Sequence, residues 1–158
     1  MKKIYLIGIG TGTPDYLTVQ AINTMKKVDV FFFLEKEERK GYEDFIKIRK
    51  EILEKYLNSG TYRVVIAKIP KRKKGSNPYV EEIKVWRQET AAVIAGLIKN
   101  EMKEGENGAL LVWVEPSLYD GHLEMLQHIL KGWIINFEYE VIPGITSVQV
   151  LAARHKIP

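Results

Sequence analysis

Three glycines at alternate positions form the most distinctive chemical feature of the sequence. They are Gly8, Gly10 and Gly12, and they directly follow a short apolar run. Glycine lets the backbone approach a ligand closely and adopt a positive φ angle, so the pattern indicates a loop that cradles a nucleotide or another cofactor. A nicotinamide or flavin fingerprint needs G-x-G-x-x-G opening directly into a helix, and here the third glycine comes one place early. A tight turn without a ligand is the other interpretation.

Charged side chains follow the second apolar run. Glu35 could accept a hydrogen bond from a ribose hydroxyl or act as a base, and Lys36 could meet a substrate carboxylate. The charges continue through residues 37–40, so a solvated charge cluster explains the same segment.

Two further loops carry side chains that could face the same ligand. The loop after the fourth apolar run contains four candidate contacts: Trp113, Val114, Glu115 and Leu118. The segment 143–147 ends with two hydroxyl side chains, Thr146 and Ser147, at the predicted start of a helix. A hydroxyl there either caps the helix or contacts a ligand, and a cap explains Thr146 at least as well as a binding role does.

The elements that must position these loops alternate between strand and helix. Apolar runs predict strands over residues 4–8, 28–33, 62–67, 109–114 and 137–142. Helical spacing predicts helices over residues 17–25, 42–57, 78–103, 118–130 and 146–155. This alternation predicts an α/β fold, with a mostly parallel five-stranded sheet and helices on both faces. Parallel sheets bind ligands at the carboxyl ends of their strands, where all the candidate loops lie.

Composition excludes several classes of site. The chain of 158 residues can form one domain with a substantial core, and its formal net charge of +4 fits an anionic partner. The sequence contains no cysteine, which excludes disulfides and thiolate metal sites, and its three histidines lack metal-ligand spacing, so we expect no metal. The apolar runs are too short to span a bilayer, so we expect a protein that does not enter the membrane.

The basic run at residues 71–74 is the only segment that suggests nucleic acid. It lacks interleaved aromatic residues, so a solvated loop between strand and helix is the favoured interpretation and we expect no nucleic-acid partner.

Taken in order, the four loops resemble those of the tetrapyrrole methylases. Residues 7–18 are similar to that family's V-G-x-G-P-G-D-P-x-x-L-T, and residues 143–147 to its P-G-[IV]-[ST]-[SA]. Residues 29–36 (D-V-F-F-F-L-E-K) are similar to a D-V-F-F-x-L-D-K segment found within the family. The resemblance extends over essentially the whole chain.

The resemblance implies methyl transfer from S-adenosylmethionine to a small-molecule tetrapyrrole, with precorrin-5 converted to precorrin-6A and acetate released, in cobalamin biosynthesis. It also implies a cytoplasmic homodimer. The family positions that hold S-adenosylmethionine fall on Gly10, Thr11, Gly12, Trp113, Val114, Glu115, Leu118, Thr146 and Ser147. Glu35 stands near the family's acidic position after the second strand and is the candidate catalytic base.

Three residues depart from the family pattern. Thr13 stands where the family has Asp, and Val114-Glu115 stands where it has Gly-Asp. If the family glycine takes a positive φ angle, a β-branched valine there is strained. Glu115 keeps the charge but reaches one methylene further, which displaces a contact.

In the family a second α/β domain follows, and the cofactor lies between the two domains. We therefore expect residues 1–116 to form the N-terminal domain, and residues 117–158 to form a linker helix and the first strand and helix of a second domain that is largely missing. This division predicts that the chain binds S-adenosylmethionine weakly or not at all. The alternative hypothesis is a degenerate, non-catalytic domain that persists as a binding or dimerising module.

Overall fold

Five parallel strands form one sheet, as the sequence predicts. The computed structural model describes all residues except 37–41, 73–74, 76–77, 119 and 133–134. The strands are β1 (Lys3–Gly8), β2 (Val30–Lys36), β3 (Arg63–Ile69), β4 (Asn107–Val112) and β5 (Glu138–Ile142). They lie in the order β3-β2-β4-β1-β5, and every pair is parallel. The predicted α/β fold class is confirmed.

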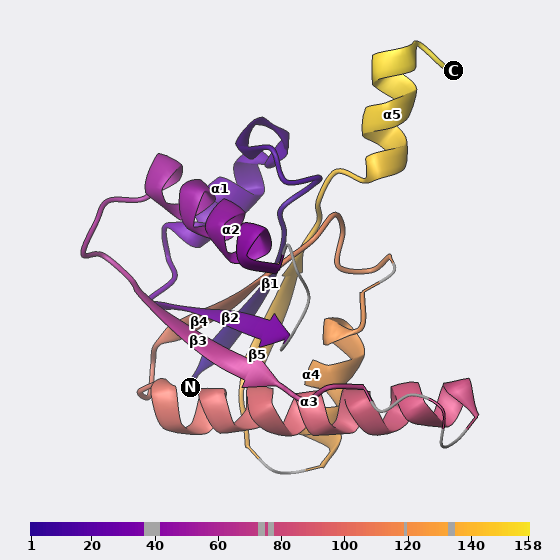
Figure 1. The fold of residues 1–158 in the computed structure, drawn as a ribbon. Coiled ribbons are helices and arrows are strands. Elements are labelled where there is room, and N and C mark those ends of the chain that lie inside the picture. The colour runs from indigo at the N-terminus through magenta and orange to yellow at the C-terminus, as the bar shows by residue number, and fades with distance from the viewer. Residues whose placement is uncertain (37–41, 73–74, 76–77, 119, 133–134) are drawn as a thin grey trace.

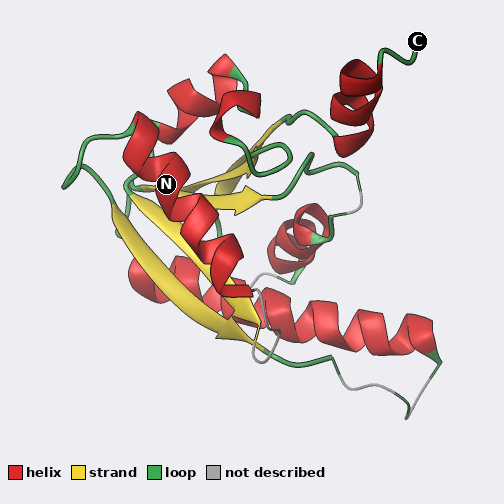
Figure 2. Ribbon diagram, turned by 45° about the horizontal axis from the view of Figure 1, so that its top comes forward, coloured by secondary structure: helices red, strands yellow, loops and turns green. Residues whose placement is uncertain are grey.

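Helices cover both faces of this sheet (Figure 1, Figure 2). They are α1 (Val19–Met25), α2 (Tyr42–Tyr56), α3 (Tyr79–Glu101) and α4 (His122–Lys131), with a short 3₁₀ helix, η1, at Pro14–Tyr16. From β1 through β2 to β3 the chain moves in one direction across the sheet, and from β3 through β4 to β5 it moves in the opposite direction. Because parallel crossovers are right-handed, the first two helices lie on one face and the next two on the other.

The alternation of side chains along β2 separates two hydrophobic cores. Phe31 and Phe33 pack with the core beneath α1 and α2, whereas Phe32 and Leu34 pack with the core beneath α3 and α4. A strand buried on both faces must be apolar at consecutive positions, which explains the unbroken run of β2.

α4 and β5 lie in the segment 117–158, for which the sequence predicts a linker helix and the start of a second domain, and β5 belongs to the same sheet as β1–β4. β5 pairs with β1 from Lys3–Glu138 to Ile7–Ile142, and α4 packs against α3. The last helix, α5 (Ser147–His155), projects from the body and has no buried residue (Figure 1). None of the described helices is long and apolar enough to cross a membrane.

The ends of several elements differ from expectation, and those of β2, β4 and α4 differ most. β2 ends at Lys36 rather than at residue 33, so Glu35 and Lys36 lie within the strand and not in a loop after it, because both pair with β3. β4 begins at Asn107 and ends at Val112 rather than Val114, because the chain turns away at Val114 with φ 62°. α4 begins at His122, four residues later than predicted, because residues 115–118 form a turn in which the Leu118 amide donates to the Glu115 carbonyl at 3.1 Å. Asn77 precedes the helix predicted at residues 78–103 and is of a type that caps helices, but it lies outside the described residues.

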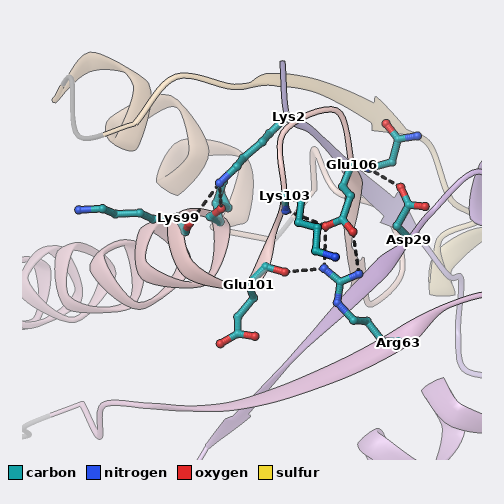
Figure 3. Close-up of polar contacts among 9 residues, drawn as sticks. Lys2, Asp29, Arg63, Lys99, Glu101, Lys103 and Glu106 are labelled. Carbon is teal, nitrogen blue, oxygen red and sulfur yellow. Dashed lines mark hydrogen bonds and ion pairs between the residues drawn. The ribbon is translucent and has the colours of Figure 1, made fainter.

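A polar network joins the amino ends of the strands (Figure 3). The Arg63 guanidinium donates to both carboxylate oxygens of Glu106, at 3.0 and 2.7 Å, and to the Glu101 carbonyl. The Lys103 amide also donates to Glu106, at 2.8 Å. The hydrogen bond from Arg63, followed by that from Lys103, lowers the pKa of Glu106 to about 2. This network lies at the opposite edge of the sheet from the candidate loops.

Candidate functional site

The loops after β1, β4 and β5 are in direct contact. A Cβ atom added to Gly8 would lie 2.7 Å from the Gly144 nitrogen and 2.9 Å from Cδ of Pro116. A Cβ atom added to Gly144 would lie 2.0 Å from the Val114 carbonyl oxygen. Side chains cannot fit at either glycine, so the close approach of the three loops explains both residues.

The loops after β1 and β4 are also joined by hydrogen bonds. The Gly10 amide donates to the Val114 carbonyl at 3.2 Å, and the Val114 amide donates to the Gly10 carbonyl at 2.8 Å. Gly10 and Gly12 both have positive φ angles, and a Cβ atom on Gly12 would come 2.8 Å from the Trp113 ring. The structure therefore brings Gly10, Gly12, Trp113 and Val114 together, as the sequence predicts for one site.

Val114 has the strained conformation that the departure from glycine predicts. Its φ angle is 62°, in the left-handed region that disfavours a β-branched side chain. Such a residue costs about 1–2 kcal/mol relative to the right-handed region. The bridge to Gly10 on one side and the contact with Gly144 on the other hold the backbone there.

The hydroxyl of Thr146 caps helix α5. Its side chain accepts a hydrogen bond from the Gln149 amide at 3.2 Å, and its own amide donates to the Gln149 side chain at 2.9 Å. This reciprocal arrangement is a capping box. Ser147, the next residue, is exposed. The structure supports the capping interpretation of Thr146, and contact of either residue with a ligand stays a prediction.

The Glu115 carboxylate contacts its own loop. Its Oε2 accepts hydrogen bonds from the Ser117 amide at 2.8 Å and from the Ser117 hydroxyl at 2.6 Å. Leu118 follows with 48% of its surface exposed, and Thr11 is half-buried in the first loop. The binding roles of these three candidates remain predictions.

A cavity of about 310 Å³ opens between the carboxyl ends of β2 and β4. The pairing of these strands ends at Phe32–Leu110, although β2 stays paired with β3 as far as Lys36 and β4 with β1 as far as Val112. The two halves of the sheet thus separate at this edge. Arg49 of α2 donates from Nε to the Leu111 carbonyl at 2.9 Å, just beyond the last β2–β4 pair.

Two tryptophans and two cations line this cavity. Lys36 lies with Nζ 5.0 Å from the centroid of the Trp86 ring, and Arg49 lies with Cζ 5.3 Å from that of Trp113. Glu35 is half-buried and lies between Leu34 and Lys36 on β2, which both line the cavity, so strand alternation directs it to the other face. Its catalytic role stays a prediction.

Sequence reasoning missed a carboxylate–histidine pair in the same cavity. Both carboxylate oxygens of Asp120 lie close to Nδ1 of His122, at 2.9 and 3.0 Å, and both residues line the cavity. The lack of metal-ligand spacing among the histidines says nothing about such a pair. The signal that could have found the pair is the Asp-x-His spacing immediately before a helix that follows a central strand.

The chain is similar to known proteins over nearly its whole length. The family model for Tetrapyrrole (Corrin/Porphyrin) Methylases matches residues 3–158. A precorrin-6A synthase (deacetylating) of Sinorhizobium sp. is 36% identical over 158 residues, which are 100% of this chain and 60% of the relative. A uroporphyrinogen-III C-methyltransferase of Cyanidium caldarium is 29% identical over 100% of this chain and 51% of the relative.

Solved structures share the fold. The crystal structure of a cobalamin synthesis related protein (CobF) from Corynebacterium diphtheriae superposes with a TM-score of 0.76 at 32% identity, covering 100% of this chain and 59% of that one. A cobalt precorrin-4 methyltransferase, CbiF, has a TM-score of 0.57 at 19% identity, covering 98% of this chain and 50% of that one, and supports the fold alone. The chain thus spans about 60% of the length of the first of these relatives. With the family model matching nearly every residue, the chain belongs to the tetrapyrrole (corrin/porphyrin) methylase family.

Proposed function

We propose that this chain forms part of an S-adenosylmethionine-dependent methyltransferase that converts precorrin-5 to precorrin-6A with release of acetate. The observation that carries the proposal is the meeting of three loops at one edge of the sheet, where Gly8 contacts Gly144 and Gly10 pairs with Val114. The 36% identity to a deacetylating precorrin-6A synthase supports this substrate among those of the family.

The residues at these loops fit a methyl donor that carries a sulfonium cation. Indole rings attract cations, as the Trp113 ring does with Arg49, and the Glu115 carboxylate would attract the sulfonium once it turns from Ser117. Gly10 and Gly12 let the backbone approach a ligand because neither has a side chain to exclude it. When bound, S-adenosylmethionine supplies an electrophilic methyl group.

The protein's part in methyl transfer is to position the reactants. Methyl transfer to an electron-rich carbon needs an in-line approach and a polar site that excludes water. Lys36 and Arg49 in the neighbouring cavity would attract the carboxylates around a tetrapyrrole and so orient the ring. The net charge of +4 favours the approach of such an anionic substrate. Glu35 remains the candidate base that follows from the resemblance.

The proposal is tested with the protein produced at the length of its relatives. The protein is incubated with precorrin-5 and S-adenosylmethionine, and the products are analysed by mass spectrometry. We expect methylated precorrin-6A together with one acetate per turnover. Uroporphyrinogen III serves as the control substrate, and a protein that methylates it instead would refute the proposed substrate while leaving methyl transfer in place.

One observation favours a second candidate, a non-catalytic domain of the same fold. The Glu115 carboxylate accepts hydrogen bonds from Ser117, and this occurs beside Val114, which has a strained φ of 62° where the family has glycine. Calorimetry with S-adenosylmethionine separates the two candidates. If only a variant carrying both Val114→Gly and Glu115→Asp binds the cofactor, the natural loop has lost its binding function.

A further inference from the structure

We infer that Asp120 and His122 form the acid–base pair that activates water for the deacetylation, with His122 as a catalytic residue and Asp120 as its positioning residue. The inference rests on the proposed function, because it concerns the acetyl group that the proposed substrate loses.

The geometry fixes the imidazole ring. Asp120 approaches Nδ1 of His122 with both carboxylate oxygens, at 2.9 and 3.0 Å, and its Oδ1 also accepts from the His122 amide at 2.8 Å. A carboxylate on Nδ1 keeps the proton on that nitrogen, so the lone pair of the neutral ring lies on Nε2. The side chains of His122 and Asp120 are only 26% and 15% exposed, which shields this pair from bulk water.

The surroundings suit an anionic, flat substrate. The cavity that contains the pair is also lined by Lys36, Arg49 and the rings of Trp86 and Trp113. The cations would meet peripheral carboxylates of the macrocycle, and the indoles offer flat apolar surfaces. A volume of about 310 Å³ accommodates one substituted edge of a tetrapyrrole rather than the whole ring. His122 would therefore face substituents, such as an acetyl group, rather than the centre of the macrocycle.

The step balances with water as the only added reactant. Nε2 of His122 accepts a proton from water, and the water oxygen bonds to the acetyl carbonyl carbon. The bond from that carbon to the ring carbon then breaks, acetic acid leaves, and the electron pair stays on the ring carbon within the conjugated system. That carbon is then the nucleophile required for methylation. The imidazolium that remains is stabilised by Asp120 and returns its proton to solvent.

Binding can be tested without catalysis. The imidazole signals of the three histidines are followed by NMR while cobyrinic acid, a corrin with free carboxylates, is added. The His122→Asn variant identifies the His122 signals by their absence. His128, on the outer part of α4, and His155, on α5, serve as internal controls because neither lines the cavity. We expect the His122 signals alone to shift. An unchanged His122, or equal shifts of all three, would overturn the inference.

Catalysis is tested in the precorrin-5 assay with His122→Asn and the matched control His128→Asn. We expect His122→Asn to lower the rate of acetate release at least 100-fold, the scale of general base catalysis, while the Kd for S-adenosylmethionine stays within threefold of wild type. His128→Asn should keep the wild-type rate. Added imidazole should partly restore acetate release to His122→Gly, which a purely structural loss would not allow.

Asp120→Asn distinguishes positioning from structure. Asparagine keeps an oxygen for the His122 amide but offers Nδ1 a weaker, uncharged partner. We expect a fall in kcat for acetate release, an unchanged KM and a displaced pH profile of kcat. Lys36 and Arg49 are the other ionisable side chains that line the cavity, and both are unchanged in this variant.

The outcomes separate the two proposals. If wild-type protein methylates precorrin-5 and His122→Asn releases acetate within threefold of its rate, the acid–base pair is wrong and the proposed function stands. If wild-type protein gives neither methylated product nor acetate, the proposed function fails and this inference fails with it.

Discussion

Val114 is a residue whose side chain is poorly suited to its backbone conformation. A β-branched side chain occupies φ 62°, and two neighbouring loops hold it there. Val114→Gly removes the steric conflict but gives the unfolded chain more freedom, so the two effects partly cancel. We expect the free energy of unfolding to rise by about 1 kcal/mol, measured by urea denaturation. Val114→Ala should gain less, because alanine keeps the Cβ atom; a loss of stability in the glycine variant would contradict the strain.

Gly144 is the position at which a side chain should be least tolerated. An added Cβ atom would lie 2.0 Å from the Val114 carbonyl oxygen, which is backbone and cannot rotate away. We expect Gly144→Ala to lower the free energy of unfolding by about 3 kcal/mol or to prevent folding. Gly96→Ala in α3 is the matched control, since its Cβ meets nothing within 4 Å and alanine favours a helix. Equal stability of both variants would show that the three loops do not pack as described.

Sequence and structure agree best where a residue's own backbone decides the outcome. The alignment of Val114 with a family glycine points to strain if φ is positive there, and it is; a hydroxyl before a predicted helix makes Thr146 a candidate cap, and it caps α5. The Asp120–His122 pair could not be predicted in this way, because it depends on how a loop turns after β4. For the same reason, the hydrogen bonds from Ser117 to Glu115 could not be predicted from the sequence.

The strands are held at their amino ends by a charged hydrogen bond with a defined pH dependence. The folded state lowers the pKa of Glu106 from 4.5 to about 2, chiefly through Arg63. The ionised carboxylate therefore stabilises the fold above about pH 4.5, and this contribution disappears as the pH falls towards 2. Because the Arg63 side chain is 41% exposed, solvent screens the pair and its contribution is about 1 kcal/mol or less.

Glu106→Gln tests this dependence. We expect the variant to be less stable than wild type at pH 7, with a difference that shrinks below pH 4.5 and nearly vanishes at about pH 2, by urea denaturation at each pH. Glu104→Gln is the control, because the Glu104 side chain is 76% exposed and pairs only with the chain's amino terminus among the described contacts. A constant difference between wild type and Glu106→Gln at every pH would contradict the assignment.

The type and order of the elements could be predicted, and their exact ends could not. Apolar runs of β2 and β4 are visible in the sequence because burial on both faces demands them. The separation of these two strands after Phe32–Leu110 has no such signature, because the twist of the sheet and the side chain of Arg49 set it. The cavity therefore could not be predicted from the sequence. The sequence does identify one of its lining residues, Lys36, as a candidate contact for a substrate carboxylate.

The arrangement of the whole protein leads to a prediction about α5. This helix stands away from the sheet and carries apolar side chains at Val148 and Leu151 that are 71% and 56% exposed. Within the family, the resemblance implies that a second domain follows and that the cofactor lies between the two. If that domain packs on α5, Val148→Ser should leave the stability of the 158-residue chain almost unchanged but destabilise a protein of its relatives' length by about 1–2 kcal/mol.

The same pair of proteins tests where the cofactor binds. We expect calorimetry to give a Kd for S-adenosylmethionine at least tenfold lower for the longer protein, because a ligand enclosed from two sides loses more contact with water than one held on an open edge. For the stability comparison, Val80→Ser is the control, since Val80 is 75% exposed and α3 lies at the opposite end of the molecule from α5 (Figure 1). Micromolar affinity in the 158-residue chain alone would contradict this expectation, because it would mean that the loops after β1, β4 and β5 suffice to bind the methyl donor.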